Sequence, residues 1–384
     1  MLPQEAEVLV VGAGPTGLAL AGTLQQAGVE VLVLEQAEEG ANTSRAAVVH
    51  ARTLEVLDEL DIARRLVAQG CSVPVFAVHD RARVVARVDF AGLPTAYPYT
   101  LMLPQSRTEA ILNERLEELG GEVQRPYQVT AVTTGRYGAA VAVAGPDGQR
   151  ETVQARYVIG ADGMQSAIRE AMGIGFSGGR YGQSVLADVR MDWPLSSQEV
   201  QLFFSPAGLV VVAPLPGGHH RVVATVDSAP VHVTESDVQT LLDERGPGHA
   251  RVHELVWESR FRVHHRVADA YRRGPALLAG DAAHVHSPAG GQGMNIGIQD
   301  AVALGRTLLE VLMERAPDAA LDDYAERRRP VAQRVVALTD RATRIATVTH
   351  PLARTARNIA IGLLGRIPAV RQRLALQLSA LSDR

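Results

Sequence analysis

A glycine-rich turn between an apolar strand and an alanine-rich helix constrains the fold of this chain most. The strand at residues 7–11 runs into Gly12-Ala13-Gly14-Pro15-Thr16-Gly17. In such a unit the first glycine permits a tight turn, the second lets the backbone approach a pyrophosphate, and the third lets helix and strand pack closely. A second strand at 29–34 ends in Glu35-Gln36, at about the 20-residue separation expected of an acid that binds a ribose hydroxyl. The sequence predicts a dinucleotide-binding unit, without separating NAD from FAD.

Two further glycine-bearing segments follow strands later in the chain. The strand at 156–161 leads to Asp162-Gly163 and a helix start with Ser166 as its expected cap. Read alone, this is a helix N-terminus with a satisfied aspartate. The strand at 276–279 leads to Gly280-Asp281, and a glycine-rich run at 288–295 precedes a helix expected from about Ile296. So many glycines suit a backbone that lies flat against a planar ligand.

These motifs together resemble the FAD-dependent aromatic hydroxylases of the para-hydroxybenzoate hydroxylase type, the class A flavoprotein monooxygenases. The resemblance is strongest to the bacterial branch that tailors polyketides and antibiotics, and it extends from Val8 to about Arg373. It implies that the first motif binds the ADP half of FAD, the second its middle, and the third its ribityl and pyrophosphate part. The residues then expected to bind FAD are Gly12, Gly14, Pro15, Thr16, Gly17, Glu35, Gln36, Arg45, Gln105, Asp162, Gly163, Gly280, Asp281, Pro288, Gly291, Gly293, Met294 and Asn295.

The resemblance also implies the chemistry. In that family reduced flavin and oxygen give a C4a-hydroperoxide that hydroxylates an electron-rich ring, and NAD(P)H is a transient reductant without a domain of its own. Pro288, Gly290 and Gly291 are expected to form the loop at the reactive ring, with no side-chain acid or base assigned. Backbone N–H groups from Gly293 to Asn295 are expected to stabilise charge on the reduced ring. The chain is therefore interpreted as an NAD(P)H-dependent monooxygenase that hydroxylates an aromatic or polyketide-like secondary metabolite.

Two departures from the family keep an alternative open. After the third motif the chain carries Ala303-Leu304-Gly305-Arg306-Thr307, where relatives often have an aromatic and a lysine, and the thioredoxin-like C-terminal domain of many polyketide hydroxylases is not found by residue 384. The alternative is an FAD-containing, non-oxidative cyclase or rearrangement enzyme of the same fold. A non-catalytic FAD protein is disfavoured because the ring loop is intact.

The predicted fold class is α/β, a Rossmann-like FAD-binding domain of the glutathione-reductase type with an inserted β-sheet substrate domain and C-terminal helices. Residues 1–73, 97–181 and 266–320 are assigned to the FAD-binding domain. Residues 74–96 and 182–265 are assigned to the substrate sheet, and 321–384 to a helical segment. A hairpin at 75–80 and 83–90 and a single connecting helix at 53–69 are expected.

Substrate residues are less clearly marked. Phe203, Val210, Val212 and Pro214 could line a pocket for a flat hydrophobic molecule, although ordinary core is the commoner meaning of such alternation. The arginine-rich, amphipathic stretch at 351–384 suits packing at the substrate entrance, a dimer contact or a membrane surface.

Composition excludes several other classes. All 38 basic residues are arginine, which removes Schiff-base catalysis and the P-loop lysine. A net charge of −4 gives no broad nucleic-acid signal, and the single cysteine, Cys71, excludes an internal disulfide framework. The paired histidines lack an acid or cysteine cluster, so no metal is expected. With no leader and no long apolar run, a cytoplasmic monomer or homodimer is expected.

Overall fold

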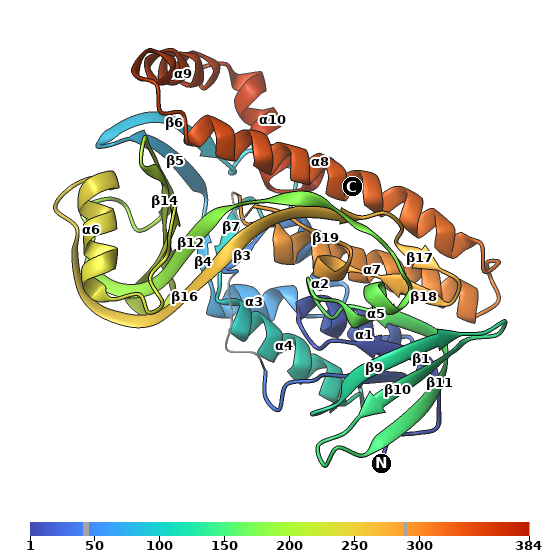
Figure 1. Ribbon diagram of the computed structural model, residues 1–384. Coiled ribbons are helices and arrows are strands. Elements are labelled where there is room, and N and C mark those ends of the chain that lie inside the picture. Colours follow the sequence, from blue (N-terminus) through green and yellow to red (C-terminus); the bar gives the residue numbers. More distant parts are fainter. Residues whose placement is uncertain (41–45, 288–289, 384) are drawn as a thin grey trace.

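Two eight-stranded sheets organise the molecule. The long helix α8 (Ala320–Ala346) runs past strands of both sheets (Figure 1). The computed structural model describes residues 1–40, 46–287 and 290–383. The structure also has a small third sheet of three strands, whose strands lie between strands of the two larger sheets along the sequence. Within the described ranges, no helix has the length and apolar character needed to cross a membrane.

The first sheet has the mixed topology of a nucleotide-binding fold. Its main path is β17 (Arg272–Arg273), β18 (Ala276–Leu278), β11 (Arg150–Gly160), β1 (Glu5–Val11), β2 (Val31–Leu34) and β8 (Val123–Gln124), with β10 (Ala139–Ala144) and β9 (Gln128–Thr134) as an antiparallel extension of β11. The pairs β18–β11, β11–β1, β1–β2 and β2–β8 are parallel. Parallel strands must be covered on both faces, which explains why the buried half of β1 at 8–11 and all of β2 are continuous apolar runs.

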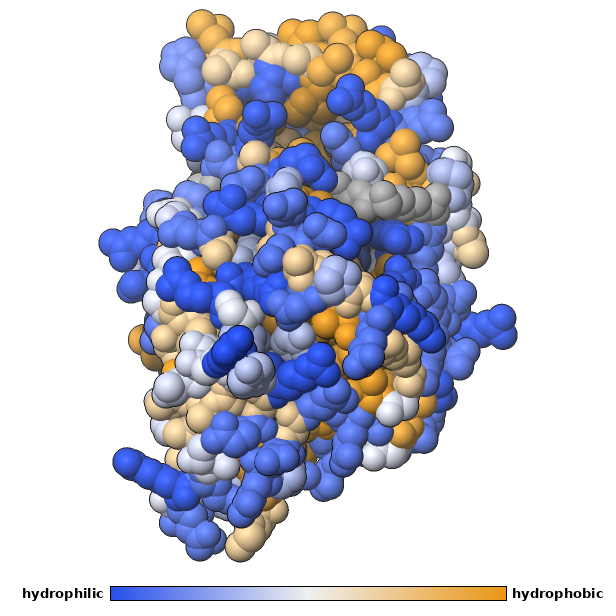
Figure 2. Space-filling model, turned by 90° about the vertical axis from the view of Figure 1, so that its right-hand side faces the viewer, coloured by the Kyte–Doolittle hydropathy of each residue, from blue (hydrophilic) through white to orange (hydrophobic). Residues whose placement is uncertain are grey.

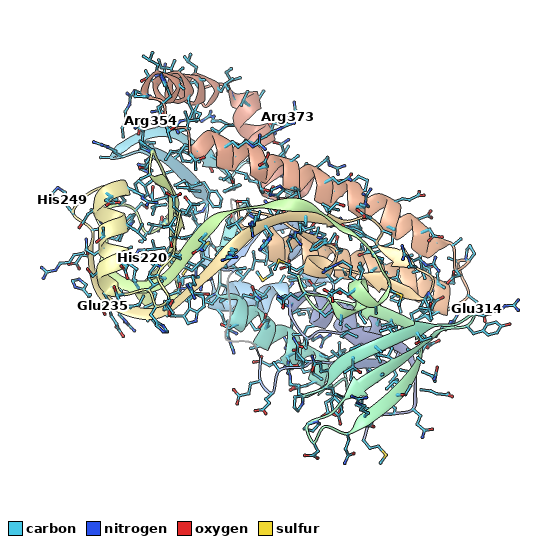
Figure 3. The ribbon with its side chains drawn as sticks, in the orientation of Figure 1. His220, Glu235, His249, Glu314, Arg354 and Arg373 are labelled. Atoms are coloured by element: carbon cyan, nitrogen blue, oxygen red, sulfur yellow. The ribbon has the colours of Figure 1, made fainter. Side chains whose placement is uncertain are left out.

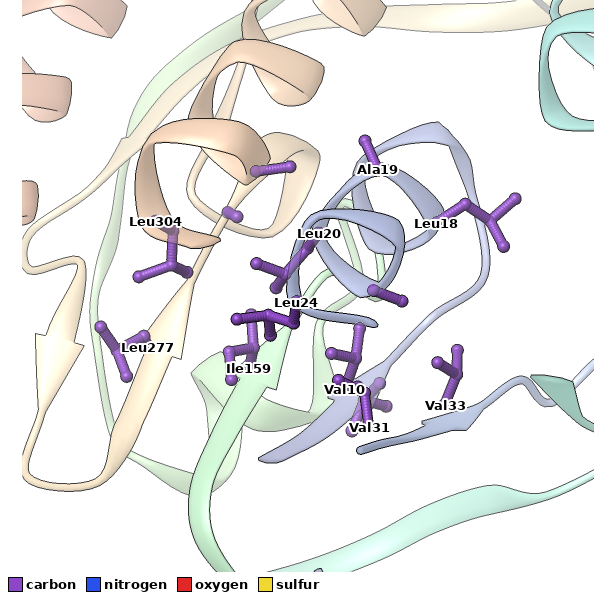
Figure 4. Packing of buried hydrophobic residues seen from close by; sticks show 14 of the residues in the cluster. Val10, Leu18, Ala19, Leu20, Leu24, Val31, Val33, Ile159, Leu277 and Leu304 are labelled. Atoms are coloured by element: carbon purple, nitrogen blue, oxygen red, sulfur yellow. The ribbon is translucent and has the colours of Figure 1, made fainter. Parts of the chain in front are cut away.

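Two helices cover one face of this sheet. Helix α1 (Pro15–Gln26) lies against α7 (Gly293–Leu312), and their side chains share a core with the strands. Figure 4 shows Leu20 and Leu24 of α1 beside Ile159 of β11, with Leu304 of α7 close by. Gly305 permits this approach, because a Cβ there would lie 2.8 Å from Cγ2 of Thr23. The unusual segment after the third motif therefore has a packing reason.

The second sheet is almost wholly antiparallel. Its order is β19 (His284–Val285), β16 (Arg251–Ala268), β12 (Phe176–Asp192), β15 (His219–Val226), β14 (Gly208–Leu215), β13 (Glu199–Ser205), β5 (Val75–Asp80) and β6 (Arg83–Asp89). One face packs on α6 (Glu235–Arg245), whose N-terminus has a capping box between Thr234 and Asp237. The expected hairpin is confirmed as β5 and β6.

The remaining elements connect these layers. The small sheet has the order β3 (Val48–Val49), β7 (Thr100–Met102) and β4 (Cys71–Val73). The other helices are α2 (Ala51–Asp58), α3 (Ala63–Gln69), α4 (Gln105–Glu118), α5 (Ala167–Ala171), α8 (Ala320–Ala346), α9 (Pro351–Leu364) and α10 (Pro368–Leu378), with short 3₁₀ turns η1 (Pro216–Gly218), η2 (Gly280–Ala282) and η3 (Leu381–Asp383).

One expected helix is wrong. The segment at 53–69 forms two helices, because the chain turns at Asp61, whose φ is +57°. Aspartate tolerates this left-handed conformation better than most residues, and the turn lets both helices bury their apolar faces.

Candidate functional site

The three glycine motifs meet at one edge of the first sheet. Pairing aligns Val11 with both Gly160 and Leu34, and Gly160 with Leu278. The turns after β1, β11, β2 and β18 therefore emerge together at the carboxyl ends of four adjacent parallel strands. Ligands of open α/β sheets bind outside these ends.

The first motif has two glycines that packing requires and one that it does not. Gly12 has a φ of +103°, and a Cβ there would lie 2.4 Å from the carbonyl oxygen of Ala161. A Cβ on Gly17 would lie 1.9 Å from the carbonyl oxygen of Gly12. Around Gly14, by contrast, no atom of the described residues lies within 4 Å of the Cβ position. The open side of Gly14, at the N-terminus of α1, leaves room for an anion.

Glu35 braces this turn from the end of β2. Its Oε2 accepts the N–H of Ala13 at 2.9 Å, and its Oε1 accepts the N–H of Ala37 at 3.0 Å. The carboxylate is half-buried and Gln36 beside it is exposed. Each carboxylate oxygen keeps further acceptor capacity, which a ribose hydroxyl can use.

The second turn contains a buried acceptor without a partner. Oδ2 of Asp162 accepts the N–H of Ile168 at 3.3 Å, whereas its Oδ1 is buried and has no hydrogen-bond partner in the described part of the chain. Burial raises the pKa of this carboxyl. Gly163 next to it has a φ of +78° and open space at its Cβ position. The aspartate is thus not fully satisfied by the protein, contrary to the simplest interpretation of the sequence.

Arg169 joins the second turn to the third and was missed by sequence reasoning. This buried guanidinium donates to the carbonyl oxygens of Ala282 at 2.9 Å and Met164 at 2.8 Å, and it lies 4.0 Å from the ring centre of Phe176. The sequence signal that could have pointed to Arg169 is its position in the first turn of the helix, three residues after the expected cap Ser166 and directly after two apolar residues.

The third turn combines a tight backbone with an exposed acid. Gly280 has a φ of +62°, and a Cβ there would lie 2.5 Å from Oγ1 of Thr16 in the first motif. Asp281 is the one exposed residue between positions 276 and 285. A carboxylate is therefore presented at the strand edge from an otherwise buried segment.

The glycine-rich loop is held from several sides. The amide of buried Asn295 donates to the carbonyl oxygens of Gly291 at 2.7 Å and Val48 at 2.8 Å, and its Oδ1 accepts the N–H of His50 at 2.7 Å. Gly290 and Gly291 have φ values of +90° and +62°. These contacts fix residues 291–295 against β3.

His50 adds a further contact to this loop. Its Nε2 lies 2.8 Å from the carbonyl oxygen of Gly290. Burial lowers the pKa of His50 to about 4, so the ring is neutral near pH 7 and its Nε2–H donates to that carbonyl. His50 is the N-cap residue of α2 by position, but its side chain makes no capping hydrogen bond and braces the loop instead.

Helix α7 begins at this loop, three residues earlier than the expected Ile296. Its first turn contains Gly293, Met294 and Asn295. N–H groups of a first turn lack intrahelical acceptors, and the helix dipole places partial positive charge there. The N-terminal end of α7 can therefore stabilise negative charge on the edge of a ring system bound beside it.

Contacts also fix the segment that precedes β3. Oε1 of Gln105 accepts the N–H of Ala46 at 3.3 Å, and Arg221 of β15 donates to the carbonyl oxygen of Ala46 at 2.8 Å. Arg221 is itself paired with buried Asp188 at 2.7 Å. The predicted site residues Arg45 and Pro288 lie outside the described residues.

The predicted pocket residues need correction. Phe203, Val210 and Val212 are buried in the core that contains α6 side chains. Pro214 is buried and alternates with these positions along β14. The intervening Val211, Ala213 and Leu215 belong to the cluster that contains Ala47, Val48 and Ala51, next to the glycine-rich loop. The sequence shows the alternation, but the face of β14 that turns to the loop carries Val211, Ala213 and Leu215 and not the predicted residues. Alternation along a strand does not tell which element covers which face.

His284, near the third motif, belongs to a buried ion-pair network. His284 and Arg328 both contact buried Asp300 at 2.6 Å. Across the described ranges, no group of three or more His, Cys, Asp and Glu residues could hold a metal ion.

Comparison with known proteins agrees with this geometry. Residues 5–339 match the family model described as FAD binding domain. The chain is 38% identical to a 6-methylpretetramide 4-monooxygenase of Streptomyces rimosus, over 99% of this chain and 70% of that protein. Its fold matches the p-nitrophenol 4-monooxygenase of Pseudomonas putida with a TM-score of 0.89 and 28% identity, covering 100% of both chains. A Diels–Alderase of pyrroindomycin biosynthesis matches with a TM-score of 0.80 and 28% identity, over 98% of this chain and 80% of that one.

The residues present fit FAD. The open side of Gly14 can take a phosphate, the unpartnered oxygen of Asp162 can accept a hydroxyl, and the first turn of α7 faces the ring loop. With the match to the family model over most of its length, the chain belongs to the FAD-dependent aromatic hydroxylases.

Proposed function

We propose that this enzyme hydroxylates a bulky aromatic, polyketide-like secondary metabolite in antibiotic biosynthesis, with NAD(P)H and molecular oxygen as co-substrates. FAD, when bound, supplies the electron transfer and oxygen activation. The observation that carries the proposal is the apolar face of the second sheet beside the glycine-rich loop. The relative named for 6-methylpretetramide supports a polycyclic substrate class.

We propose the following roles for the residues at the sheet edge. Gly14 and the N-terminus of α1 bind the pyrophosphate, Glu35 binds the adenosine ribose, and Asp281 binds the ribityl or pyrophosphate portion. Asp162 accepts a hydroxyl of the cofactor's middle, for which its Oδ1 has capacity. The first turn of α7 stabilises negative charge at the ring, with the loop backbone held by Asn295 and His50.

The substrate is placed between the ring loop and the second sheet. The surrounding cluster is apolar, with Val211, Ala213 and Leu215 from β14 and Leu378 near the C-terminal end of the chain. The charged group that approaches from the sheet, Arg221, is already paired with Asp188. Such walls position a flat hydrophobic molecule and exclude water, whereas a small benzoate would require a cation for its carboxylate.

We further propose that residues 1–73, 97–181 and 266–320, which contain every strand of the first sheet, form the cofactor domain, and that 74–96 and 182–265 form the substrate domain. Strands β12 and β16 of the second sheet extend across these boundaries, and β19 lies within the cofactor ranges. The enzyme is expected to work in the cytoplasm, because NAD(P)H is available there. We expect it to be a monomer or a homodimer.

The test is NAD(P)H oxidation and oxygen uptake by the FAD-loaded protein with a panel of phenolic polyketides and, as a comparison, small benzoates. We expect one polycyclic phenol to stimulate both rates and to yield a product heavier by one oxygen atom. Stimulation by a benzoate alone would contradict the proposed substrate class.

A second function is favoured by the likeness to the Diels–Alderase. In that case FAD has a structural role and the apolar cluster shapes a cyclisation. The same assay separates the two, because this function predicts that no panel member stimulates NAD(P)H oxidation while FAD stays bound.

A further inference from the structure

The C-terminal helices carry an apolar surface that the other described residues of the chain leave exposed. Leu352, Ile359, Leu363, Ile367, Val370 and Leu374 are 76, 58, 57, 46, 36 and 36% exposed, and we call them the α9–α10 patch. Figure 2 shows apolar side chains gathered at the top of the molecule, the end at which Figure 1 places α9 and α10. Contiguous apolar surface of this kind marks an interaction site, whereas single exposed side chains do not.

Helix α9 is oriented with its polar side toward the protein. Arg354 pairs with Asp80 of β5 at 3.0 Å, and Asn358 donates to the same carboxylate. Buried Arg357 donates to the carbonyl oxygens of Ile345 and Ala346, each at 3.1 Å. Leu352, Ile359 and Leu363 share the opposite side, at helical spacings of seven and four residues. The protein thus holds α9 by charge and hydrogen bonds and presents its apolar stripe outward.

The surface around the patch is cationic. Between residues 341 and 382 the chain has seven arginines and no aspartate or glutamate, although its net charge is −4. Arg366, Arg371 and Arg373 are exposed, and none has an ion-pair partner in the described part of the chain. Figure 3 places Arg373 on α10 beside α8, at the same end of the molecule as Arg354.

We propose that the α9–α10 patch docks on the surface of an anionic lipid bilayer. The apolar stripe would enter the interface between headgroups and acyl chains, and the exposed arginines would contact acidic headgroups. A second copy is a poorer partner, because a two-fold contact through the patch would bring like charges together with no acid in the segment to offset them. The helices lie on the membrane and do not span it.

The test is co-sedimentation of the FAD-loaded, 384-residue protein with vesicles. We expect partition onto vesicles of equal parts phosphatidylglycerol and phosphatidylcholine to exceed that onto phosphatidylcholine alone by roughly 10- to 100-fold at about 0.1 M salt, and to fall at high salt. Ile359→Asp with Leu363→Asp should abolish binding. Arg366→Gln, Arg371→Gln and Arg373→Gln together should reduce binding to the anionic vesicles to the level seen with neutral ones.

Matched controls use exposed residues outside the patch. Val231→Asp with Val256→Asp, and Arg136→Gln with Arg150→Gln and Arg260→Gln, should leave vesicle binding unchanged. Equal binding to neutral and anionic vesicles would overturn the proposal. The proposal would also be overturned if the protein did not bind vesicles and instead formed a dimer in analytical ultracentrifugation that Leu363→Asp dissociates. Flavin content of each variant reports folding, and the result does not depend on the hydroxylation assay.

Discussion

At the scale of the residue, the glycines of the first motif separate folding from cofactor binding. Gly14→Ala places its methyl group in open space with a φ of −74°, which alanine tolerates, so the apoprotein should melt at the same temperature. We expect its FAD affinity to fall at least about tenfold, because the methyl group enters the phosphate site. Gly17→Ala should instead lower the free energy of unfolding by more than about 2 kcal/mol through its clash with Gly12. Calorimetry and FAD titration measure both effects, and a Gly14→Ala protein with normal FAD affinity would refute the placement.

Asp281 gives a second prediction at this scale. Asp281→Ala should weaken FAD binding by roughly 10- to 100-fold, because it removes a charged acceptor from the strand edge. The ratio of flavin to protein absorbance after purification measures the loss. Asp147→Ala, an exposed acid in a distant turn, is the control and should retain FAD. Full flavin content in the Asp281 variant would mean that the third motif does not contact the cofactor.

At the scale of the element, the α1–α7 contact determines how the first and third motifs meet. Gly305→Val should destabilise the protein by about 2 kcal/mol or more, because even a Cβ would lie 2.8 Å from Thr23. Gly22→Ala in α1 is the matched change, since its Cβ would lie 4.0 Å from Leu60 and alanine favours a helix by about 0.5–1 kcal/mol. Denaturant titration should therefore give opposite signs for the two variants. If both variants were destabilised equally, close packing at Gly305 would not be the reason for the loss of stability in Gly305→Val.

Sequence reasoning succeeded at this scale where local chemistry decides the structure. The turns at Gly12, Asp162 and Gly280 follow directly from strand, glycine and helix signals, and they occur where expected. It failed where tertiary packing decides. Nothing local marks Asp61 as the break between α2 and α3, and β14 has two apolar faces, so Val210 and Val211 cannot be assigned to α6 or to the ring loop from the sequence alone. Arg169 was missed because its acceptors belong to turns that only the fold brings together.

At the scale of the whole molecule, the site is a junction of segments far apart in the chain. His50, Asn295 and the C-terminal segment meet at the ring loop, where Gln292 donates to the carbonyl oxygen of Leu378 at 2.8 Å. Arg221 connects the second sheet to Ala46. Global stability and the order of the ring loop are therefore coupled, and a group buried at this junction should influence both.

The pH dependence of unfolding tests this coupling through His50. Burial lowers its pKa from 6.5 to about 4. Above pH 6.5 both folded and unfolded forms are neutral, so the shift has no effect there. As the pH falls from 6.5 toward 4, the unfolded chain takes up a proton that the folded protein does not, and stability should fall by up to about 3 kcal/mol. His50→Gln keeps a donor for Gly290 without titrating, so the free energy of unfolding at saturating FAD should vary less across this range. His249→Gln, at an exposed histidine (Figure 3), is the control and should retain the wild-type profile. Identical profiles for His50→Gln and wild type would show that His50 takes up its proton in the folded protein as readily as in the unfolded chain, and that the loop carbonyl is not held by a neutral ring.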